Sequence, residues 1–182
     1  MITKVKKFLP VTFLLTVLVF LVQATLTADK SSASKEKKDV EYRNYINSKI
    51  KKLEIKTTDG LVLNQKSESR PVILNFWASW CTPCIKEFKS LNKLKSKYKD
   101  KILIIGINND DEDPLITIKK IEDKYNLLFS SMSDPDSEIA SLLNLKHVPS
   151  TIVLKNSKVE FIKEGEMSFQ SPEFEKVLDK LL

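Results

Sequence analysis

The chain contains only two cysteines, and they lie three positions apart in the run Trp80-Cys81-Thr82-Pro83-Cys84. A structural disulfide across so short a loop would add only about 2 kcal/mol of stability on chain-entropy grounds. Two thiols at this spacing are better suited to exchange, in which a thiolate attacks a disulfide sulfur and forms a mixed disulfide. The sequence therefore predicts redox chemistry at this pair, with the Cys81-Cys84 disulfide itself as the redox group and no separate cofactor.

The residues after the pair predict an amphipathic helix that begins at the cysteines. Apolar residues recur at helical spacing with lysines on the opposite side, at Ile85, Phe88, Leu91, Leu94 and Tyr98. The free N–H groups and the dipole at a helix N-terminus favour a thiolate, and can lower a cysteine pKa from about 8.5 to between about 3.5 and 7.5. We therefore expect Cys81 to be the exposed nucleophile and Cys84, one turn deeper, to be the resolving thiol.

Glu87 follows Cys84 by three residues, so the two side chains are expected on the same helix face. A carboxylate at that position is suited to accept the proton of the Cys84 thiol. The alternative is a solvated glutamate on a lysine-rich helix, and the pattern alone leaves both open.

The surrounding elements predict an α/β fold with a central mixed sheet flanked by helices. Strands and helices alternate over most of the chain, which favours parallel pairing. A hairpin around Asp59-Gly60 precedes them, and two strands joined by the turn Asn156-Ser157 must be antiparallel. The expected strands are Val72 to Trp77, Ile102 to Ile107, Leu127 to Met132, Thr151 to Leu154 and Val159 to Ile162.

Three further helices have recognisable starts. The acidic run Asp110 to Asp113 is expected to cap a helix opened by Pro114. Ser137 is the expected cap of a short helix reaching about Leu143, and Ser171 that of a helix running to the C-terminus.

The N-terminal region has the order of an export signal. Lys4, Lys6 and Lys7 precede the apolar run Phe8 to Val22, and small residues follow. Val22-Gln23-Ala24 suits cleavage, although a retained membrane anchor is also compatible with an apolar run somewhat shorter than the usual ~20 residues. The predicted division is a signal peptide or anchor at 1–24, a polar linker at 25–49 that is helical near its end, and a catalytic domain at 50–182.

Charge and composition exclude one class of partner. The 182 residues are 42% hydrophobic, enough for a real core, and carry a net charge of +6. Lysines and acids are interleaved and the only arginines are Arg43 and Arg70, whereas nucleic-acid binding calls for a one-sided basic patch. No nucleic-acid partner is expected.

These residues resemble the thioredoxin superfamily, and more narrowly the TlpA/ResA/CcmG-like exported thiol-disulfide oxidoreductases. The resemblance covers about residues 51–182. It rests on the run Asn75-Phe76-Trp77-Ala78-Ser79-Trp80-Cys81-Thr82-Pro83-Cys84, on Lys86-Glu87-Phe88, and on Val148-Pro149-Ser150-Thr151. It implies a thioredoxin fold with an N-terminal β-hairpin extension.

The resemblance also implies roles for single residues. Pro149 is expected in a cis peptide bond packed against the cysteines, and Trp80, Val148 and Pro149 are expected to contact substrate. Asn75 and Glu87 match the exported subgroup, where the glutamate tunes the thiols.

The implied activity is reduction of disulfides in exported clients, with apocytochrome c among the candidates, in the periplasm or an equivalent extracytoplasmic space. A membrane thiol carrier would then act as electron donor. An oxidase or isomerase of the same fold remains an alternative, because the direction of electron flow depends on a reduction potential that the sequence does not give.

Two departures from the subgroup and two rival functions remain. Lys89 stands where a proline is common, and His147 stands where a small residue is common, either as a surface imidazole or as a titratable neighbour of Cys81. A copper-binding or metallochaperone module is disfavoured, because copper-delivery relatives of this fold space their cysteines more widely. Two cysteines and one histidine also fall short of the four ligands of structural zinc. A tethered binding module with an incidental cysteine pair is the other rival.

Overall fold

The computed structural model describes residues 9–63 and 68–182, and the chain divides into two units, Met1–Asn44 and Tyr45–Leu182. Helix α1 (Leu9–Ile50) forms the described part of the first unit and contributes its last residues to the second. In the first unit, the apolar side chains from Phe13 to Val22 are exposed. Over the described residues, no helix combines the length and the apolar character needed to cross a bilayer.

The helical prediction near Tyr42 to Ile50 is confirmed, but the helix also includes residues 25–41 of the expected linker. Lysine, glutamate and alanine are good helix formers even where their side chains are not buried. This intrinsic preference explains why the polar segment is helical although it lacks large apolar residues. The predicted domain boundary at residue 50 falls within the folded unit. Ile46 and Ile50 are fully buried there, and Asn47 Oδ1 accepts the backbone N–H of Val159 at 2.7 Å.

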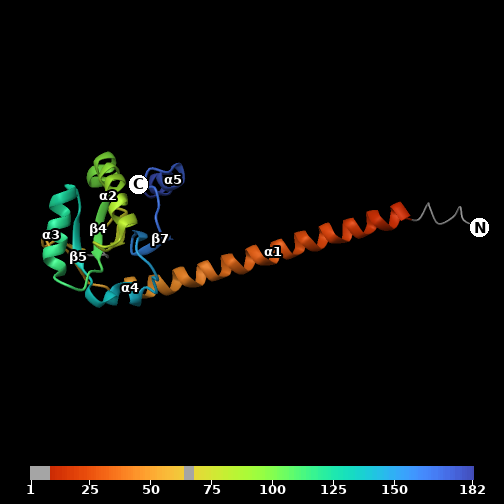
Figure 1. The fold of residues 1–182 in the computed structure, drawn as a ribbon, viewed down its shortest axis with the longest axis horizontal. Coiled ribbons are helices and arrows are strands. Elements are labelled where there is room, and N and C mark those ends of the chain that lie inside the picture. Colours follow the sequence, from red (N-terminus) through yellow and green to blue (C-terminus); the bar gives the residue numbers. More distant parts are fainter. Residues whose placement is uncertain (1–8, 64–67) are drawn as a thin grey trace, which may run out of the picture. The chain divides into compact units, whose positions relative to one another are not determined.

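The second unit is built on a five-stranded mixed sheet in the order β5-β4-β3-β6-β7 (Figure 1). Strand β3 pairs parallel with β4 and antiparallel with β6, while β4 pairs parallel with β5 and β6 antiparallel with β7. The bounds are β3 (Val72–Trp77), β4 (Leu103–Asn108), β5 (Ser130–Ser133), β6 (Ser150–Lys155) and β7 (Lys158–Glu164). The α/β class and the mixed sheet are therefore confirmed.

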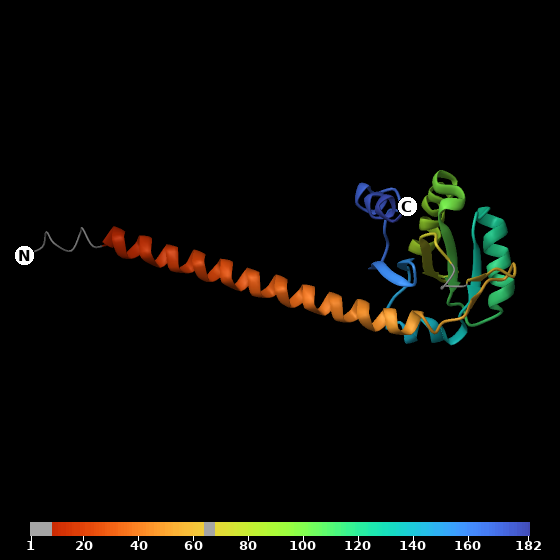
Figure 2. The ribbon, with the colours of Figure 1, turned by 180° about the vertical axis from the view of Figure 1, so that it is seen from behind.

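The expected hairpin forms a separate two-stranded antiparallel sheet, β1 (Ile55–Lys56) and β2 (Val62–Leu63). Its turn lies against β5, seen from behind in Figure 2. The N–H of Thr58 donates to the carbonyl of Ser131 at 2.9 Å, and the hydroxyl of Ser130 donates to Asp59 at 2.6 Å. The extension thus covers the edge strand that would otherwise remain unpaired.

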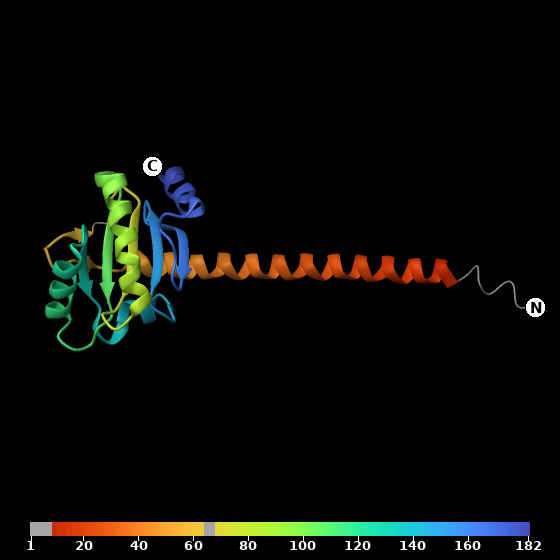
Figure 3. The same ribbon diagram turned by 45° about the horizontal axis from the view of Figure 1, so that its top comes forward.

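Three helices pack on one face of the sheet around a single apolar cluster. Figure 3 shows α2 crossing the front of the sheet, with α3 and α5 on either side of it. The helices of this unit are α2 (Thr82–Tyr98), α3 (Pro114–Tyr125), α4 (Glu138–Leu142) and α5 (Pro172–Leu181), with 3-10 turns η2 (Lys99–Lys101) and η3 (Pro135–Ser137). β3 and β4 are buried along their whole length, which explains their mainly apolar sequences.

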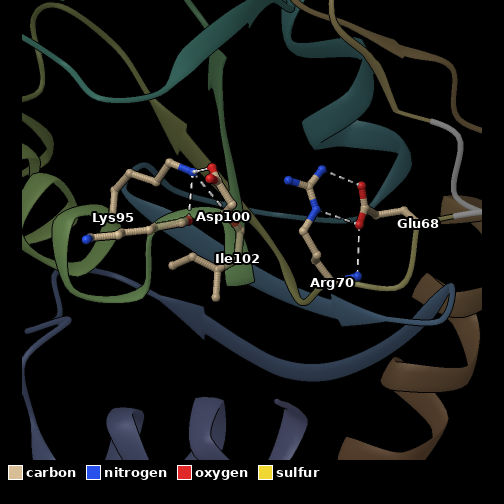
Figure 4. Close-up of polar contacts among 6 residues, drawn as sticks. Glu68, Arg70, Lys95, Asp100 and Ile102 are labelled. Atoms are coloured by element: carbon tan, nitrogen blue, oxygen red, sulfur yellow. Dashed lines mark hydrogen bonds and ion pairs between the residues drawn. The ribbon is translucent and has the colours of Figure 1, made fainter.

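Side chains fix the ends of these central elements (Figure 4). Lys95 Nζ donates to the carbonyls of Lys99 at 2.8 Å and Ile102 at 3.3 Å, so a lysine satisfies acceptors at the end of α2. Just before β3, Arg70 binds Glu68 through two side-chain nitrogens at 2.9 and 2.8 Å. These contacts stabilise the segment before β3 and the turn between α2 and β4.

The expected helix caps are only partly correct. Ser171 does cap α5, because its hydroxyl accepts the N–H of Phe174 at 3.3 Å. Ser137 was expected to cap the short helix, but it has a left-handed backbone and makes no capping bond. Asp134 does so instead, accepting the N–H groups of Ile139 at 2.8 Å and Ala140 at 3.1 Å.

Gly106 in β4 generates a prediction about stability. A Cβ at this position would lie 2.7 Å from Nε1 of the buried Trp77 and would also collide with Oγ of Ser131. Because overpacking typically costs about 1–3 kcal/mol, we expect Gly106→Ala to lower the free energy of unfolding by that amount in urea titrations. Adding Ser131→Ala should recover part of the loss, since it removes one of the two collisions. An unchanged midpoint in Gly106→Ala would contradict this account of the strand.

Candidate active site

Cys81 and Cys84 form a disulfide with a sulfur–sulfur distance of 2.00 Å at the N-terminus of α2. Cys81 is the N-cap residue, and its Sγ accepts the backbone N–H of Cys84 at 3.2 Å. This is the environment that stabilises a thiolate, because the donor and the helix dipole both favour negative charge on Sγ. The predicted placement of the pair at the start of a helix is confirmed.

The two sulfurs differ little in exposure when joined. Cys81 is 4% exposed and Cys84 fully buried, so Cys81 is the outer cysteine of the two but is not the exposed residue that the sequence predicted. Pro83 occupies the first turn of α2, where the missing N–H leaves no helical bond unmade. Trp80, immediately before the pair, is 71% exposed and offers a large apolar surface beside it.

The loop before β6 contains the expected cis peptide bond, between Val148 and Pro149. Val148 packs against the apolar cluster that includes both cysteines, while Pro149 is buried and its carbonyl accepts the N–H of Gly165 at 2.8 Å. Trp80 and Val148 line one cavity of about 440 Å³, and the exposed His147 lies at the same cavity. Two of the three expected substrate-contacting residues therefore share one hollow, which begins at Trp80, the residue before Cys81.

Glu87 is a buried residue, 2% exposed, and not the solvated glutamate that was the alternative. One carboxylate oxygen accepts the backbone N–H of Met167 at 2.7 Å, and the other accepts the Asn75 amide at 3.3 Å. Burial raises the pKa of the Glu87 carboxyl to about 7, although both hydrogen bonds act in the opposite direction. A carboxyl with that pKa can both accept and release a proton near neutrality.

Asn75 connects Glu87 to the strand that follows the cis bond. Its Nδ2 also donates to the hydroxyl of Thr151 at 3.3 Å. The central strand, the cysteine helix and β6 are thus joined by one buried polar group. Both Asn75 and Thr151 belong to the sequence motifs, but the motifs do not predict the hydrogen bond between them.

Sequence reasoning missed two participants around the pair. Met167 holds Glu87 from the segment after β7, and nothing in its local sequence marks it. Asp110 was expected at the cap of α3, but it is buried and binds Ser79, two residues before Cys81. Within residues 9–63 and 68–182, no group of three or more His, Cys, Asp or Glu side chains is arranged to hold a metal ion.

A thioredoxin fold with a Cys-x-x-Cys disulfide at a helix N-terminus, beside a cis-proline loop, defines a thiol-disulfide oxidoreductase. The sequence profile of the AhpC/TSA family matches residues 46–162. The chain therefore belongs to the AhpC/TSA family, and the predicted superfamily is confirmed.

Individual relatives agree with this assignment. Thiol-disulfide oxidoreductase ResA of Oceanobacillus iheyensis is 31% identical over 103 residues, 56% of this chain, and the match spans about half (53%) of that protein. The protein of the same name from Bacillus thuringiensis strain Al Hakam is 32% identical over 133 residues, 70% of each chain. The crystal structure of a DsbF homologue from Corynebacterium diphtheriae superposes with a TM-score of 0.59 at 26% identity, over 70% of this chain and 83% of that one.

The buried Glu87 predicts a pH-dependent stability. Its pKa rises from an ordinary 4.5 to about 7 on folding, so its contribution to stability is complete below pH 4.5 and is lost as the pH rises through 7. The shift corresponds to about 3 kcal/mol. We expect the wild-type protein to lose that much stability relative to Glu87→Gln between these pH values, measured by urea unfolding of the oxidised proteins. A difference that stays constant across this range would show that Glu87 does not titrate there.

Proposed function

We propose that this protein reduces disulfides in exported proteins through its Cys81-Cys84 pair. The observation that carries the proposal is the helix-capping position of Cys81 Sγ, with the buried carboxyl of Glu87 one turn beyond Cys84. The first feature supports a nucleophilic thiolate, and the second supports a proton acceptor for the resolving thiol.

In the first step the reduced enzyme binds a client disulfide over Trp80 and Val148, with the buried Pro149 behind them. The Cys81 thiolate attacks one client sulfur, so that a Cys81–client disulfide forms and the client's other sulfur leaves as a thiolate. The cavity of about 440 Å³ beside Trp80 and Val148 offers room for client residues on either side of the reacting sulfurs.

In the second step Cys84 releases the client. Glu87 takes the proton from the Cys84 thiol, and the resulting thiolate attacks Cys81 Sγ. The Cys81–Cys84 disulfide forms, the client sulfur departs as a second thiolate, and the client has gained two electrons. A pKa of about 7 suits Glu87 to this transfer, because the carboxylate is then present in a substantial fraction at neutral pH.

The proposed place of action is supported by the N-terminal sequence, and the proposed electron donor by the need to recycle the enzyme. The lysines, apolar run and small residues of 1–24 support export, with either cleavage or retention as an anchor. Outside the cytoplasm no glutathione or thioredoxin pool would return Cys81 and Cys84 to their thiol form. A membrane thiol carrier is therefore the proposed electron donor, and exported proteins with disulfides, including apocytochrome c, are the proposed clients.

Trapping tests the nucleophile, the resolving thiol and the compartment together. We expect Cys84→Ala, expressed as the full chain, to accumulate mixed disulfides with clients, visible as reducible adducts on non-reducing gels. The adducts should be absent from Cys81→Ala and should fractionate outside the cytoplasm, whereas deletion of residues 1–24 should abolish them. If Cys84→Ala yields no adducts while remaining folded, the protein does not act by this mechanism.

The direction of electron flow is tested by equilibrating the wild-type pair with glutathione buffers. We expect a reduction potential near the thioredoxin end of the range, about −270 mV, rather than near the about −120 mV of strong oxidases. A value at the oxidising end would exclude the reductase and favour the oxidase alternative, leaving the exchange chemistry itself intact.

A further inference from the structure

Asp110 lies just beyond the end of β4 and reaches the loop that delivers the nucleophilic cysteine. It is 6% exposed. Its two carboxylate oxygens accept the backbone N–H of Ser79 at 3.1 and 3.0 Å, and one of them accepts the Ser79 hydroxyl at 3.1 Å. The amide of Asn108, itself fully buried, donates to the carboxylate at 2.7 Å. Every one of these partners is a donor, which matches the acceptor-only character of a carboxylate.

Ser79 is the second residue of the turn that connects β3 to α2. The turn is closed by the N–H of Cys81, which donates to the carbonyl of Ala78 at 3.1 Å. On the other side, the N–H of Asn109 donates to the carbonyl of Trp77 at 2.9 Å and keeps the two strand ends together. Asp110 therefore binds the middle of a four-residue turn whose last residue is the nucleophile, and fixes that turn relative to the end of β4.

This restraint acts unequally on the two redox states. Closing the disulfide requires Cys81 and Cys84 to be held at bonding distance, so a rigid turn raises the effective concentration of one thiol at the other. The charge of the carboxylate acts in the same direction, because its partner Ser79 lies two residues before Cys81, and a negative charge on that side repels a thiolate but not a neutral disulfide. Both effects stabilise the oxidised pair relative to the reduced pair.

We propose that Asp110 is a positioning residue for Cys81, which stabilises the disulfide through its bonds to Ser79 and so makes the pair a stronger reductant. The inference rests on the proposed function in that it assumes thiol–disulfide exchange at this pair. It assigns to a carboxylate outside the Cys-x-x-Cys motif a part of the driving force for client reduction.

The test is the equilibrium with glutathione, measured on the full chain. In this reaction two glutathione thiols give two electrons and two protons to the Cys81–Cys84 disulfide, producing two protein thiols and one glutathione disulfide. We expect Asp110→Ala to raise the equilibrium constant for reduction about tenfold, the scale of one charge-assisted hydrogen bond. Asp110→Asn, which retains one acceptor for the Ser79 N–H, should raise it less.

Glu112→Gln is the matched control, because it removes one negative charge from the exposed part of the same acidic run and should leave the equilibrium constant unchanged. Thermal unfolding provides the second readout: Asp110→Ala should lower the melting temperature of the oxidised protein more than that of the reduced protein. A merely structural role would lower both equally and leave the redox equilibrium where it is, and that result would overturn the proposal. If Asp110→Ala does not fold, the same comparison is made with Asp110→Asn and Ser79→Ala, and unchanged equilibrium constants in both would overturn it equally.

The experiment also separates this inference from the proposed function. The wild-type potential alone decides whether the protein is a reductase. The shift between variant and wild type decides the role of Asp110, whichever direction the wild-type potential supports.

Discussion

The fold depends on the central position of β3, which is hydrogen-bonded on both sides. It pairs with β4 along its whole length, from Val72 opposite Leu103 to Trp77 opposite Asn108, and with β6 on the other side. The strand cannot shift without breaking two ladders, so the point at which it ends is defined within one residue. Because α2 begins only a short turn later, the position of Cys81 is determined by sheet register rather than by the flexible geometry of a loop.

The same strand carries a polar side chain through an apolar core. Asn75 lies on the face covered by α2, where it meets Glu87 and Thr151, and its own Oδ1 has no hydrogen-bond partner within the described part of the chain. Burying these groups costs stability that a purely apolar layer would not. Such a cost is reasonable if Glu87 has the proposed role of proton acceptor for Cys84, which is itself fully buried.

Much of the architecture could be predicted because its signals are periodic and strong. The two fully buried strands, the amphipathic α2 and the hairpin at Asp59-Gly60 all have local patterns that tertiary packing reinforces. The cis bond at Pro149 and the expected substrate contacts were predicted from resemblance and not from any property of the local residues. The hydrogen bond from Met167 to Glu87 was not predicted, because its donor is a backbone N–H, which any residue type other than proline would supply.

The errors also have physical causes. Ser137 has the residue type of a helix cap but a left-handed backbone, so its hydroxyl is not in place to accept, and Asp134 reaches the free N–H groups from further back. Asp110 lies in an acidic run that suggested a dipole partner for α3. The sequence cannot show that the run bends toward β3 after Asn108, where three donors are available to it.

The last turns of α1 have a consequence for the edge of the sheet. β7 is an edge strand, and an outward-facing N–H of such a strand is a template on which a second chain can pair. The side-chain oxygen of Asn47 accepts the N–H of Val159, and Ile46 and Ile50 are buried in the same unit. A fragment that begins at residue 51 would therefore lack these contacts. Its unpaired strand edge and uncovered apolar surface would favour self-association.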